Sequence, residues 1–238
     1  MTDTHTIVLL GGSGLGPWAW QRVIPVLDAR GFRTLAPQLR ATGEDATPAA
    51  KVSLGDWIDD ITGFLADHEL SDVTLVAHSF AGYVAAGALA RDAGAIRTAV
   101  FLDAVLPQPG TSWFEVMGPG VEQYMTGLAI DGAIPWFTGE QLDQVYPGHG
   151  ISNDDFAWMR SKLTPQPIAT YAEPAIAEPL ETTRAKLAYV RCLRTTPPAA
   201  DIAEDSPGWT FRALDAGHWP MITHPDATAR AIEELARR

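Results

Sequence analysis

The residues best suited to chemistry begin with Ser79, in the stretch TLVAHSFAGYV at positions 74–84. An apolar run precedes this serine and a small-residue helical pattern follows it, which is typical of a nucleophile held in a sharp turn between a strand and a helix. Such a turn needs small residues two positions before and after the serine, because strand and helix pass within contact distance there. Ala77 and Ala81 stand where G-x-S-x-G has glycines, and Gly82 leaves further room. The stretch therefore predicts a nucleophilic serine in a slightly crowded turn, and a buried serine at a strand end is the alternative.

A base for this serine is found near the end of the chain. His218 stands in the segment AGHWP at positions 216–220, in a turn predicted between the last strand and the last helix. A serine nucleophile needs a base within hydrogen-bond distance, and imidazole titrates near neutral pH. Ser79 and His218 thus form a candidate pair. No comparable context surrounds the other histidines, which are His5, His68, His78, His149 and His224.

The glycine-rich segment GGSGLG at positions 11–16 follows the first predicted strand and has two candidate uses. Dinucleotide-binding folds place G-x-G-x-x-G there, but the glycines here give G-x-G-x-G. The second predicted strand also lacks the acidic residue that binds a ribose hydroxyl, and no tyrosine is followed by a lysine four positions later. The segment instead fits an oxyanion hole, because glycines let backbone N–H groups approach a substrate closely. We expect the backbone N–H groups of Ser13 and Phe80 to be the donors, and we expect no cofactor.

Short apolar runs alternate with helical patterns in the first half of the chain and again near its end. Near-continuous apolar runs are expected for parallel strands that are buried on both faces. The alternation predicts a right-handed, mostly parallel, doubly wound α/β sheet. The predicted strands are Thr6–Leu10, Arg33–Ala36, Val73–Ala77, Ala99–Leu102, Leu187–Leu193 and Trp209–Leu214. The predicted helices are Trp18–Arg30, one that starts at a capping box of Ser53 and Asp56, Tyr83–Arg91, and one from about Pro225 with Thr223 and Asp226 at capping spacing.

Residues 107–185 interrupt this alternation with frequent proline, glycine and aromatic residues. A stretch of this length between two strands is usually functional. We expect a helical lid inserted between late strands, with Trp113, Trp136 and Trp158 binding the substrate. The alternative is a helical layer that packs its aromatic side chains against the sheet. The α/β core then consists of residues 1–106 and 186–238.

Composition and charge exclude several classes of partner. Hydrophobic residues make up 46% and charged residues 19% of the 238 residues, which is ordinary for one soluble globular domain. The formal net charge of −12 disfavours nucleic acids and anionic membranes, because the basic residues form no local patch. The single cysteine, Cys192, excludes an internal disulfide and a multi-cysteine metal site, and we expect no metal. The apolar run Ile7–Leu10 is too short for a signal peptide or a membrane span, so the expected location is the cytoplasm.

Beyond these local patterns, the sequence resembles the α/β-hydrolase superfamily, in the small-lid branch of EstC-like esterases, plant methyl-ester esterases and hydroxynitrile lyases. The resemblance implies the α/β-hydrolase fold and a triad of serine, histidine and an acid. Members of this branch usually place the acid just after the strand that is predicted here at Leu187–Leu193, but Thr195 stands at the matching position. The segments that carry the resemblance are the glycine loop with Gly16–Trp20, Ala77–Gly82, Leu102–Pro107, Thr164–Pro167 and Gly217–Met221.

The missing acid has three candidate solutions. Asp103 ends the preceding predicted strand, where some superfamily members place their acid, and it keeps the chain order of serine, acid and histidine. Asp103 could also only cap a loop, in which case Asp201, Glu204 or Asp205 would orient His218. The third solution is a serine–histidine dyad without an acid. The choice matters because neutralising the acid of a serine protease lowers turnover about 10⁴-fold.

Three function classes follow from these residues. The first is a serine hydrolase that cleaves a small to medium apolar carboxylic ester or lactone by acyl transfer through Ser79, with His218 and Asp103 as its partners. The second is a cofactor-independent lyase, cyclase or dehydratase that uses Ser79 and His218 as acid and base, which the empty acid position motivates. The third is a non-catalytic receptor. All three take a small molecule, and an oligomer is compatible with each.

Overall fold

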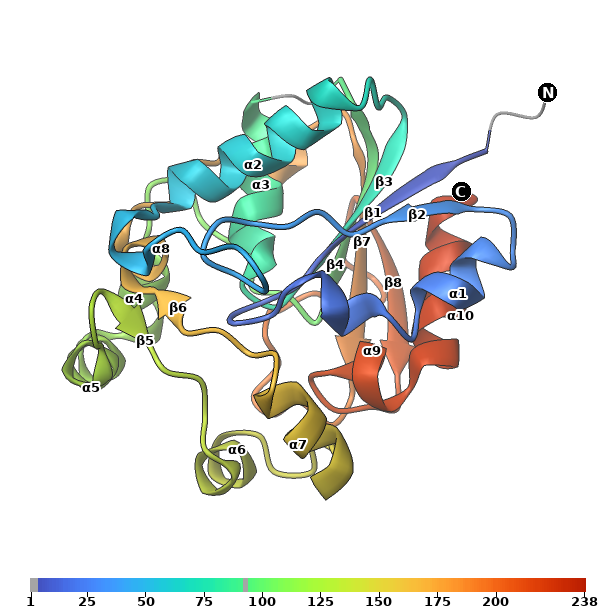
Figure 1. The fold of residues 1–238 in the computed structure, drawn as a ribbon. Helices are drawn as coiled ribbons and strands as arrows, with labels where there is room; N and C mark the ends of the chain where they lie inside the picture. Colours follow the sequence, from blue (N-terminus) through green and yellow to red (C-terminus); the bar gives the residue numbers. More distant parts are fainter. Residues whose placement is uncertain (1–3, 92–93) are drawn as a thin grey trace.

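A computed structural model describes residues 4–91 and 94–238. Six parallel strands form the central sheet in the order β2-β1-β3-β4-β7-β8 (Figure 1). The predicted α/β class with a mostly parallel, doubly wound sheet is therefore confirmed. The strands are β1 Thr6–Leu10, β2 Arg33–Leu35, β3 Val73–His78, β4 Ile96–Leu102, β7 Lys186–Cys192 and β8 Trp209–Leu214.

Helices cover both faces of the sheet, and alternate side chains of each strand enter opposite layers of the core. Val8 and Leu10 of β1 belong to the apolar cluster under α2 (Leu54–Asp67) and α3 (Ala81–Arg91). Their neighbours Ile7 and Leu9 belong to a second cluster under α1 (Ile24–Asp28) and α10 (Pro225–Ala236). Figure 1 shows these two helical layers on either side of the strands. A strand buried on both faces must be apolar at every position, which explains the near-continuous runs in the sequence.

Helix ends follow their capping chemistry where the signal is complete. Ser53 and Asp56 form the predicted capping box of α2: Ser53 Oγ accepts from the Asp56 N–H at 3.0 Å, and Asp56 Oδ2 accepts from the Ser53 N–H at 2.9 Å. The predicted cap of the last helix is wrong. The Thr223 hydroxyl instead donates to the Trp219 carbonyl at 3.1 Å and closes the short helix α9 (Pro220–Thr223), so that His224 precedes α10.

The single helix predicted at Trp18–Arg30 is also wrong. The chain forms a 3₁₀ turn, η1 (Pro17–Trp20), followed by the short helix α1. Pro25 explains the break, because proline has no N–H to continue a helical ladder and is tolerated only in the first turn of a helix. The buried side of this segment is as predicted, because Trp20, Val23 and Leu27 lie in the core.

Residues 107–185, which we call the insertion, lie between two strands that pair directly, β4 and β7. Figure 1 shows its helices grouped at one end of the molecule, away from both termini. The domain boundaries and the function of the insertion as a lid stay predictions. Its elements are α4 Trp113–Met117, α5 Pro119–Leu128, β5 Ala133–Ile134, α6 Gly139–Val145, α7 Asn153–Arg160, β6 Gln166–Pro167, α8 Ile168–Ala172 and η3 Leu180–Thr182.

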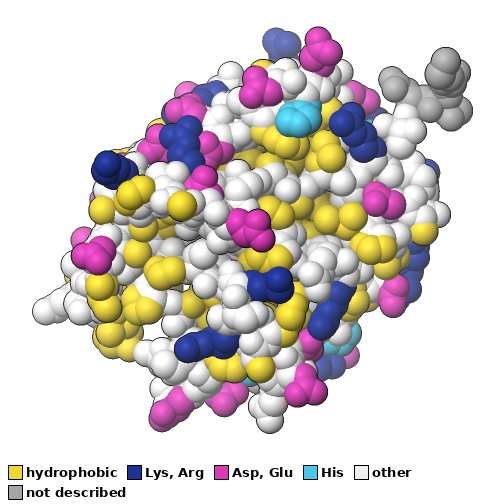
Figure 2. Space-filling model, viewed as in Figure 1, with side chains coloured by type: hydrophobic (Ala, Val, Ile, Leu, Met, Phe, Trp, Pro, Cys, Tyr) yellow, Lys and Arg dark blue, Asp and Glu magenta, His cyan; other side chains and the backbone are white. Residues whose placement is uncertain are grey.

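The insertion exposes several large hydrophobic side chains. Figure 2 shows hydrophobic side chains over the region of α4 and α5 and also over the middle of this face, with acidic and basic side chains scattered across it. Within residues 4–91 and 94–238, no helix combines the length and apolar character needed to cross a bilayer. Large hydrophobic side chains exposed on the insertion are Val116, Met117, Tyr124, Leu128, Ile130, Val145 and Ile176.

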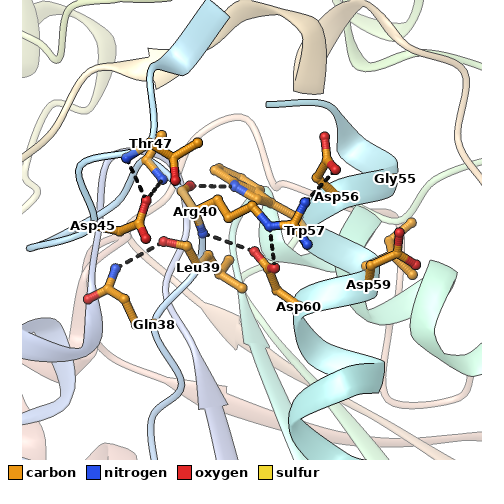
Figure 3. Close-up of polar contacts among 12 residues, drawn as sticks. Gln38, Leu39, Arg40, Asp45, Thr47, Gly55, Asp56, Trp57, Asp59 and Asp60 are labelled. Carbon is orange, nitrogen blue, oxygen red and sulfur yellow. Dashed lines mark hydrogen bonds and ion pairs between the residues drawn. The ribbon is translucent and has the colours of Figure 1, made fainter. Parts of the chain in front are cut away.

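An ionic network fixes the loop that follows β2 to α2 (Figure 3). Arg40 pairs with Asp56 and with Asp60, and its carbonyl accepts from Trp57 Nε1 at 2.8 Å. The same loop touches the glycine-rich segment, since a Cβ added at Gly16 would lie 2.9 Å from the Cα of Gly43. The network thereby supports one flank of the glycine-rich segment.

Candidate active site

Ser79 lies in the turn between β3 and α3, with a backbone φ of 56°. This left-handed conformation is uncommon for a residue other than glycine and is typical of a strained functional turn. Ala77 and Ala81 are buried on either side, as the steric argument requires. A Cβ at Gly82 would lie 2.0 Å from the carbonyl oxygen of Val105, so only glycine fits there. Crowding in this turn is thus relieved one position later than in G-x-S-x-G.

The imidazole of His218 links Ser79 to Asp103. His218 Nε2 lies 2.8 Å from Ser79 Oγ, and His218 Nδ1 lies 2.7 Å from Asp103 Oδ2. Ser79 and Asp103 are brought together by the sheet, because His78 of β3 and Leu102 of β4 pair in register and each functional residue follows directly. The structure therefore brings together the three side chains that the sequence selected.

The carboxylate of Asp103 is fully buried and accepts three hydrogen bonds. Besides His218, its donors are the Thr195 hydroxyl at 2.6 Å and the Cys192 N–H at 3.0 Å. Burial alone would raise the pKa of Asp103, but the hydrogen bonds from His218, Thr195 and Cys192 outweigh it and hold the pKa below its ordinary value. The threonine at the empty acid position thus supports an acid that comes from the neighbouring strand.

The alternative acids lie elsewhere. Asp201, Glu204 and Asp205 are exposed, and none of them hydrogen-bonds to His218. A dyad without an acid is equally inconsistent with the contact between His218 and Asp103.

Two residues beside His218 were missed in the sequence. His78 is buried, and its Nε2–H donates to the backbone carbonyl of His218 at 2.7 Å. Burial lowers the pKa of His78 to about 3, so this ring is neutral and its donated proton is fixed on Nε2. Tyr146, which follows α6, stacks on the His218 ring at 4.8 Å between centroids and 17° between planes. The position of His78 directly before Ser79 was a usable signal, whereas nothing in the sequence separates Tyr146 from the other aromatic residues of the insertion.

The two backbone N–H groups that the sequence predicts as oxyanion donors belong to fixed peptides. In the described residues, neither the Ser13 nor the Phe80 N–H donates to another protein group. The peptide that carries the Phe80 N–H is fixed through the Ser79 carbonyl, which accepts from Gly82 at 3.1 Å and from Val105 at 3.2 Å. The peptide that carries the Ser13 N–H is fixed in the same way, through a bond from the Leu15 N–H to the Gly12 carbonyl at 3.0 Å. Because N–H and C=O are opposed across a trans peptide, each fixed carbonyl sets the direction of its N–H.

The glycine-rich segment approaches the serine as closely as its composition suggested. A Cβ at Gly12 would lie 2.6 Å from the Cβ of Ser79. Gly12 therefore packs directly against the serine, at a place where no larger side chain would fit.

The three predicted substrate-binding tryptophans lie in different surroundings. Trp113 stacks on Tyr171 at 4.3 Å between ring centroids and meets the Phe80 ring edge-on at 6.5 Å, beside the turn that holds Ser79. Trp136 donates from Nε1 to the Ser13 carbonyl at 3.1 Å. Trp158 instead packs edge-on against Trp18 at 5.3 Å, under the Arg22 guanidinium, in the second core cluster. Neither of these two ring contacts involves Ser79, His218 or Asp103.

The arrangement can perform nucleophilic attack with proton transfer at one oxygen. In such an arrangement a buried carboxylate can orient the imidazole and stabilise its charged form, and the imidazole can remove the serine proton. Residues 4–91 and 94–238 contain no group of three or more His, Cys, Asp or Glu side chains that could hold a metal ion.

A parallel sheet with a nucleophile turn after β3 and a histidine after β8 defines an α/β-hydrolase, and the model of the alpha/beta hydrolase family matches residues 7–231. The chain belongs to this family. The resemblance noted in the sequence is thereby confirmed.

Named relatives lie within the same branch. The chain is 27% identical over 241 residues to the carbendazim hydrolyzing esterase of Nocardioides sp. (strain SG-4G), covering 96% of this chain and 98% of that protein. It is 36% identical over 103 residues to methylesterase 1 of Arabidopsis thaliana, covering 42% of this chain and 39% of that protein. Among solved structures, an extracellular alpha/beta-hydrolase from a Paenibacillus species aligns with a TM-score of 0.86 at 17% identity, over 98% of this chain and all of that one, and supports the fold.

Proposed function

We propose that this protein hydrolyses a carboxylic ester or lactone by acyl transfer through Ser79. The contact that carries the proposal is the bridge made by His218, with Nε2 2.8 Å from Ser79 Oγ and Nδ1 2.7 Å from Asp103 Oδ2. The relatives that are named esterase and methylesterase support the same class of reaction.

The reaction proceeds in two halves. His218 Nε2 takes the proton of Ser79 Oγ as that oxygen attacks the carbonyl carbon, and the Ser13 and Phe80 N–H groups stabilise the resulting oxyanion. His218 then gives the proton to the leaving alkoxide. In the second half His218 removes a proton from water, and the hydroxide attacks the acyl group on Ser79. The bond from the acyl carbon to Ser79 Oγ then breaks, His218 returns the proton to that oxygen, and the carboxylic acid leaves. Asp103 holds the imidazole so that Nδ1–H faces the carboxylate and the lone pair of Nε2 faces the serine.

The substrate that best fits this site is a small to medium uncharged molecule. The Phe80, Trp113 and Tyr171 rings pack together beside Ser79, and Tyr146 lies against His218. Among the described residues, the arginine side chains that lie over aromatic rings do so at Trp158, Phe156 and Phe32, and not at the rings beside Ser79. An apolar acyl or alkoxy group would therefore bind without leaving a charge unpaired.

The lyase hypothesis loses the observation that motivated it. It was based on the empty acid position at Thr195, but Asp103 provides a carboxylate 2.7 Å from His218 Nδ1. A nucleophile with its base and acid is the arrangement that acyl transfer requires, and the fluorophosphonate experiment below separates it from acid–base chemistry without a covalent intermediate.

A p-nitrophenyl ester series with increasing acyl length tests the proposal, together with labelling by a fluorophosphonate and intact-mass measurement. Wild-type protein should turn over and gain one label, whereas Ser79→Ala and His218→Ala should lose activity at least about 10³-fold. Ser161→Ala, at an exposed serine, is the matched control and should keep both properties. Undiminished turnover in Ser79→Ala would remove Ser79 from the mechanism.

A further inference from the structure

The peptide that joins Ser13 to Gly14 is held from both sides by side chains of the insertion. Its carbonyl, on Ser13, accepts from Trp136 Nε1 at 3.1 Å, and its N–H, on Gly14, donates to Gln166 Oε1 at 3.2 Å. The next carbonyl, on Gly14, accepts from the Thr164 N–H at 3.1 Å. A loop that is otherwise a glycine-rich turn thus has its backbone direction set by residues more than a hundred positions away.

The contact between the two segments is too close for any other residue at position 14. Gly14 has a φ of 69°, and a Cβ there would lie 2.7 Å from both the Thr164 carbonyl oxygen and Trp136 Cδ1. Gln166 is itself fixed: it is 4% exposed, and its Nε2 donates to Thr170 Oγ1 at 2.6 Å. Thr170 in turn donates to the Pro167 carbonyl at 2.6 Å. The amide of Gln166 therefore has one orientation, with Oε1 directed at the loop.

Tyr171 connects the insertion to both halves of the oxyanion hole. Its hydroxyl donates to Ser13 Oγ, and its ring meets the Phe80 ring edge-on at 4.7 Å between centroids. Tyr171 is buried, so the loss of this bond would cost the hydroxyl its hydrogen-bond partner. One side chain of the insertion thus contacts both Ser13 and Phe80, the residues whose N–H groups are the proposed oxyanion donors.

We propose that Gln166 and Tyr171 are positioning residues. By holding the Ser13–Gly14 peptide and the Ser13 side chain, they fix Ser13 itself and thereby keep its N–H, in the preceding peptide, directed at the oxyanion, so that the hole is complete only while the insertion is packed on the glycine-rich loop. This inference rests on the proposed hydrolase function. An oxyanion hole acts on charge that exists only in the transition state and in the tetrahedral intermediate. Loss of either residue should therefore lower kcat and leave KM almost unchanged.

The test uses Gln166→Leu and Tyr171→Phe in the full-length protein, with the p-nitrophenyl ester that the wild type cleaves best. Removal of a whole oxyanion donor costs about 10²–10³ in kcat, so a misdirected donor should cost about 10–100-fold. KM should stay within about twofold, because the lost contact is made to the transition state and not to the bound substrate. Gln144→Ala and Tyr124→Phe are matched controls, since both side chains are exposed on the same insertion, and they should keep wild-type kcat.

A second measurement separates the oxyanion hole from general damage to the site. A trifluoromethyl ketone that matches the ester forms a tetrahedral adduct with Ser79, whereas the corresponding methyl ketone binds as a planar carbonyl. In Tyr171→Phe, the Ki of the trifluoromethyl ketone should rise by the same factor as kcat/KM falls, and the Ki of the methyl ketone should change less than about twofold. Equal weakening of both ketones, or an unchanged kcat in both variants, would overturn the proposal.

A double-mutant comparison keeps the proposal testable even if Gln166→Leu does not fold. Ser13→Ala keeps the backbone N–H and removes the hydroxyl that Tyr171 binds, so Ser13→Ala and Tyr171→Phe should have similar effects. The double variant should be no worse than either single variant, because both remove one contact. Additive losses would contradict a shared role. Failure of the proposed function is a different result: the wild type would then not be labelled at Ser79 and would not hydrolyse the esters at all.

Discussion

Asp103→Asn is the sharpest single perturbation of this site. The two carboxylate oxygens have separate tasks: Oδ2 accepts from His218 Nδ1 and Thr195 Oγ1, and Oδ1 accepts from the backbone N–H of Cys192. An asparagine has only one acceptor oxygen for these two sides. If it serves Cys192, its NH₂ faces His218 Nδ1 and forces the proton onto Nε2, where it blocks removal of the Ser79 proton. If the oxygen instead accepts from His218, the NH₂ group faces the buried N–H of Cys192, and two donors oppose each other.

Either orientation should lower kcat by about 10⁴, the loss found when the acid of a serine protease is neutralised. That loss corresponds to about 5.4 kcal/mol of transition-state stabilisation at 1.36 kcal/mol per tenfold change. The assay is steady-state hydrolysis of the best p-nitrophenyl ester, with circular dichroism to confirm the fold. Asp201→Asn and Glu204→Gln are the matched controls, because these exposed carboxylates were the alternative acids. An Asp103→Asn enzyme that keeps a tenth of its kcat, or a comparable loss in either control, would refute the assignment.

Three further outcomes follow from the same contacts. Gly82→Ala should lower the free energy of unfolding by at least about 2 kcal/mol in denaturant titration, since its Cβ would lie 2.0 Å from a carbonyl oxygen, whereas Gly63→Ala, with no atom within 4 Å, should be neutral or stabilising. The lowered pKa of Asp103 contributes stability that is present above the unfolded pKa and is lost as pH falls through the folded one. Thr195→Val removes one cause of that lowering and should move acid unfolding to higher pH, whereas Thr195→Ser should not. The buried His78, with its pKa lowered to about 3, should make stability fall as pH drops from 6.5 towards 3, by up to about 1.4 kcal/mol per pH unit, and His78→Gln should flatten this dependence in urea titrations at each pH.

Much of the sheet could be predicted because burial on both faces leaves a simple pattern. The predicted ranges of β1 and β8 coincide with those in the structure, and β3 is longer only by His78. The start of β4 was missed because Arg97 and Thr98 are polar, although Thr98 is buried and Arg97 is partly buried. The ends of a strand that carry polar residues do not continue the apolar run, so the sequence pattern predicts a strand that is too short.

The three side chains of the triad were found because each follows a strand whose position could be predicted. Their roles in catalysis stay predictions until the variants are made. The contacts from the insertion to the glycine-rich loop could not be predicted, because Gln166 and Ser13 belong to segments whose relative placement depends on the whole fold. Pro25 was a local signal against a single helix at Trp18–Arg30, but the apolar residues at helical spacing favoured one continuous helix. The stripe correctly gave the buried side, but the missing N–H decided where the helix begins.

Because Asp103 supplies the acid from the end of β4, the connection between β7 and β8 does not have to provide one, and its sequence and length can vary. Once Thr195 is in place, the following residues 196–208 are mostly solvent-exposed and supply no group to the chemistry. A peptide tag, a fluorophore attachment point or a longer recognition loop could be grafted there while turnover is retained. Natural variants of this enzyme should tolerate length changes in this stretch more readily than in any other connection at the same edge of the sheet.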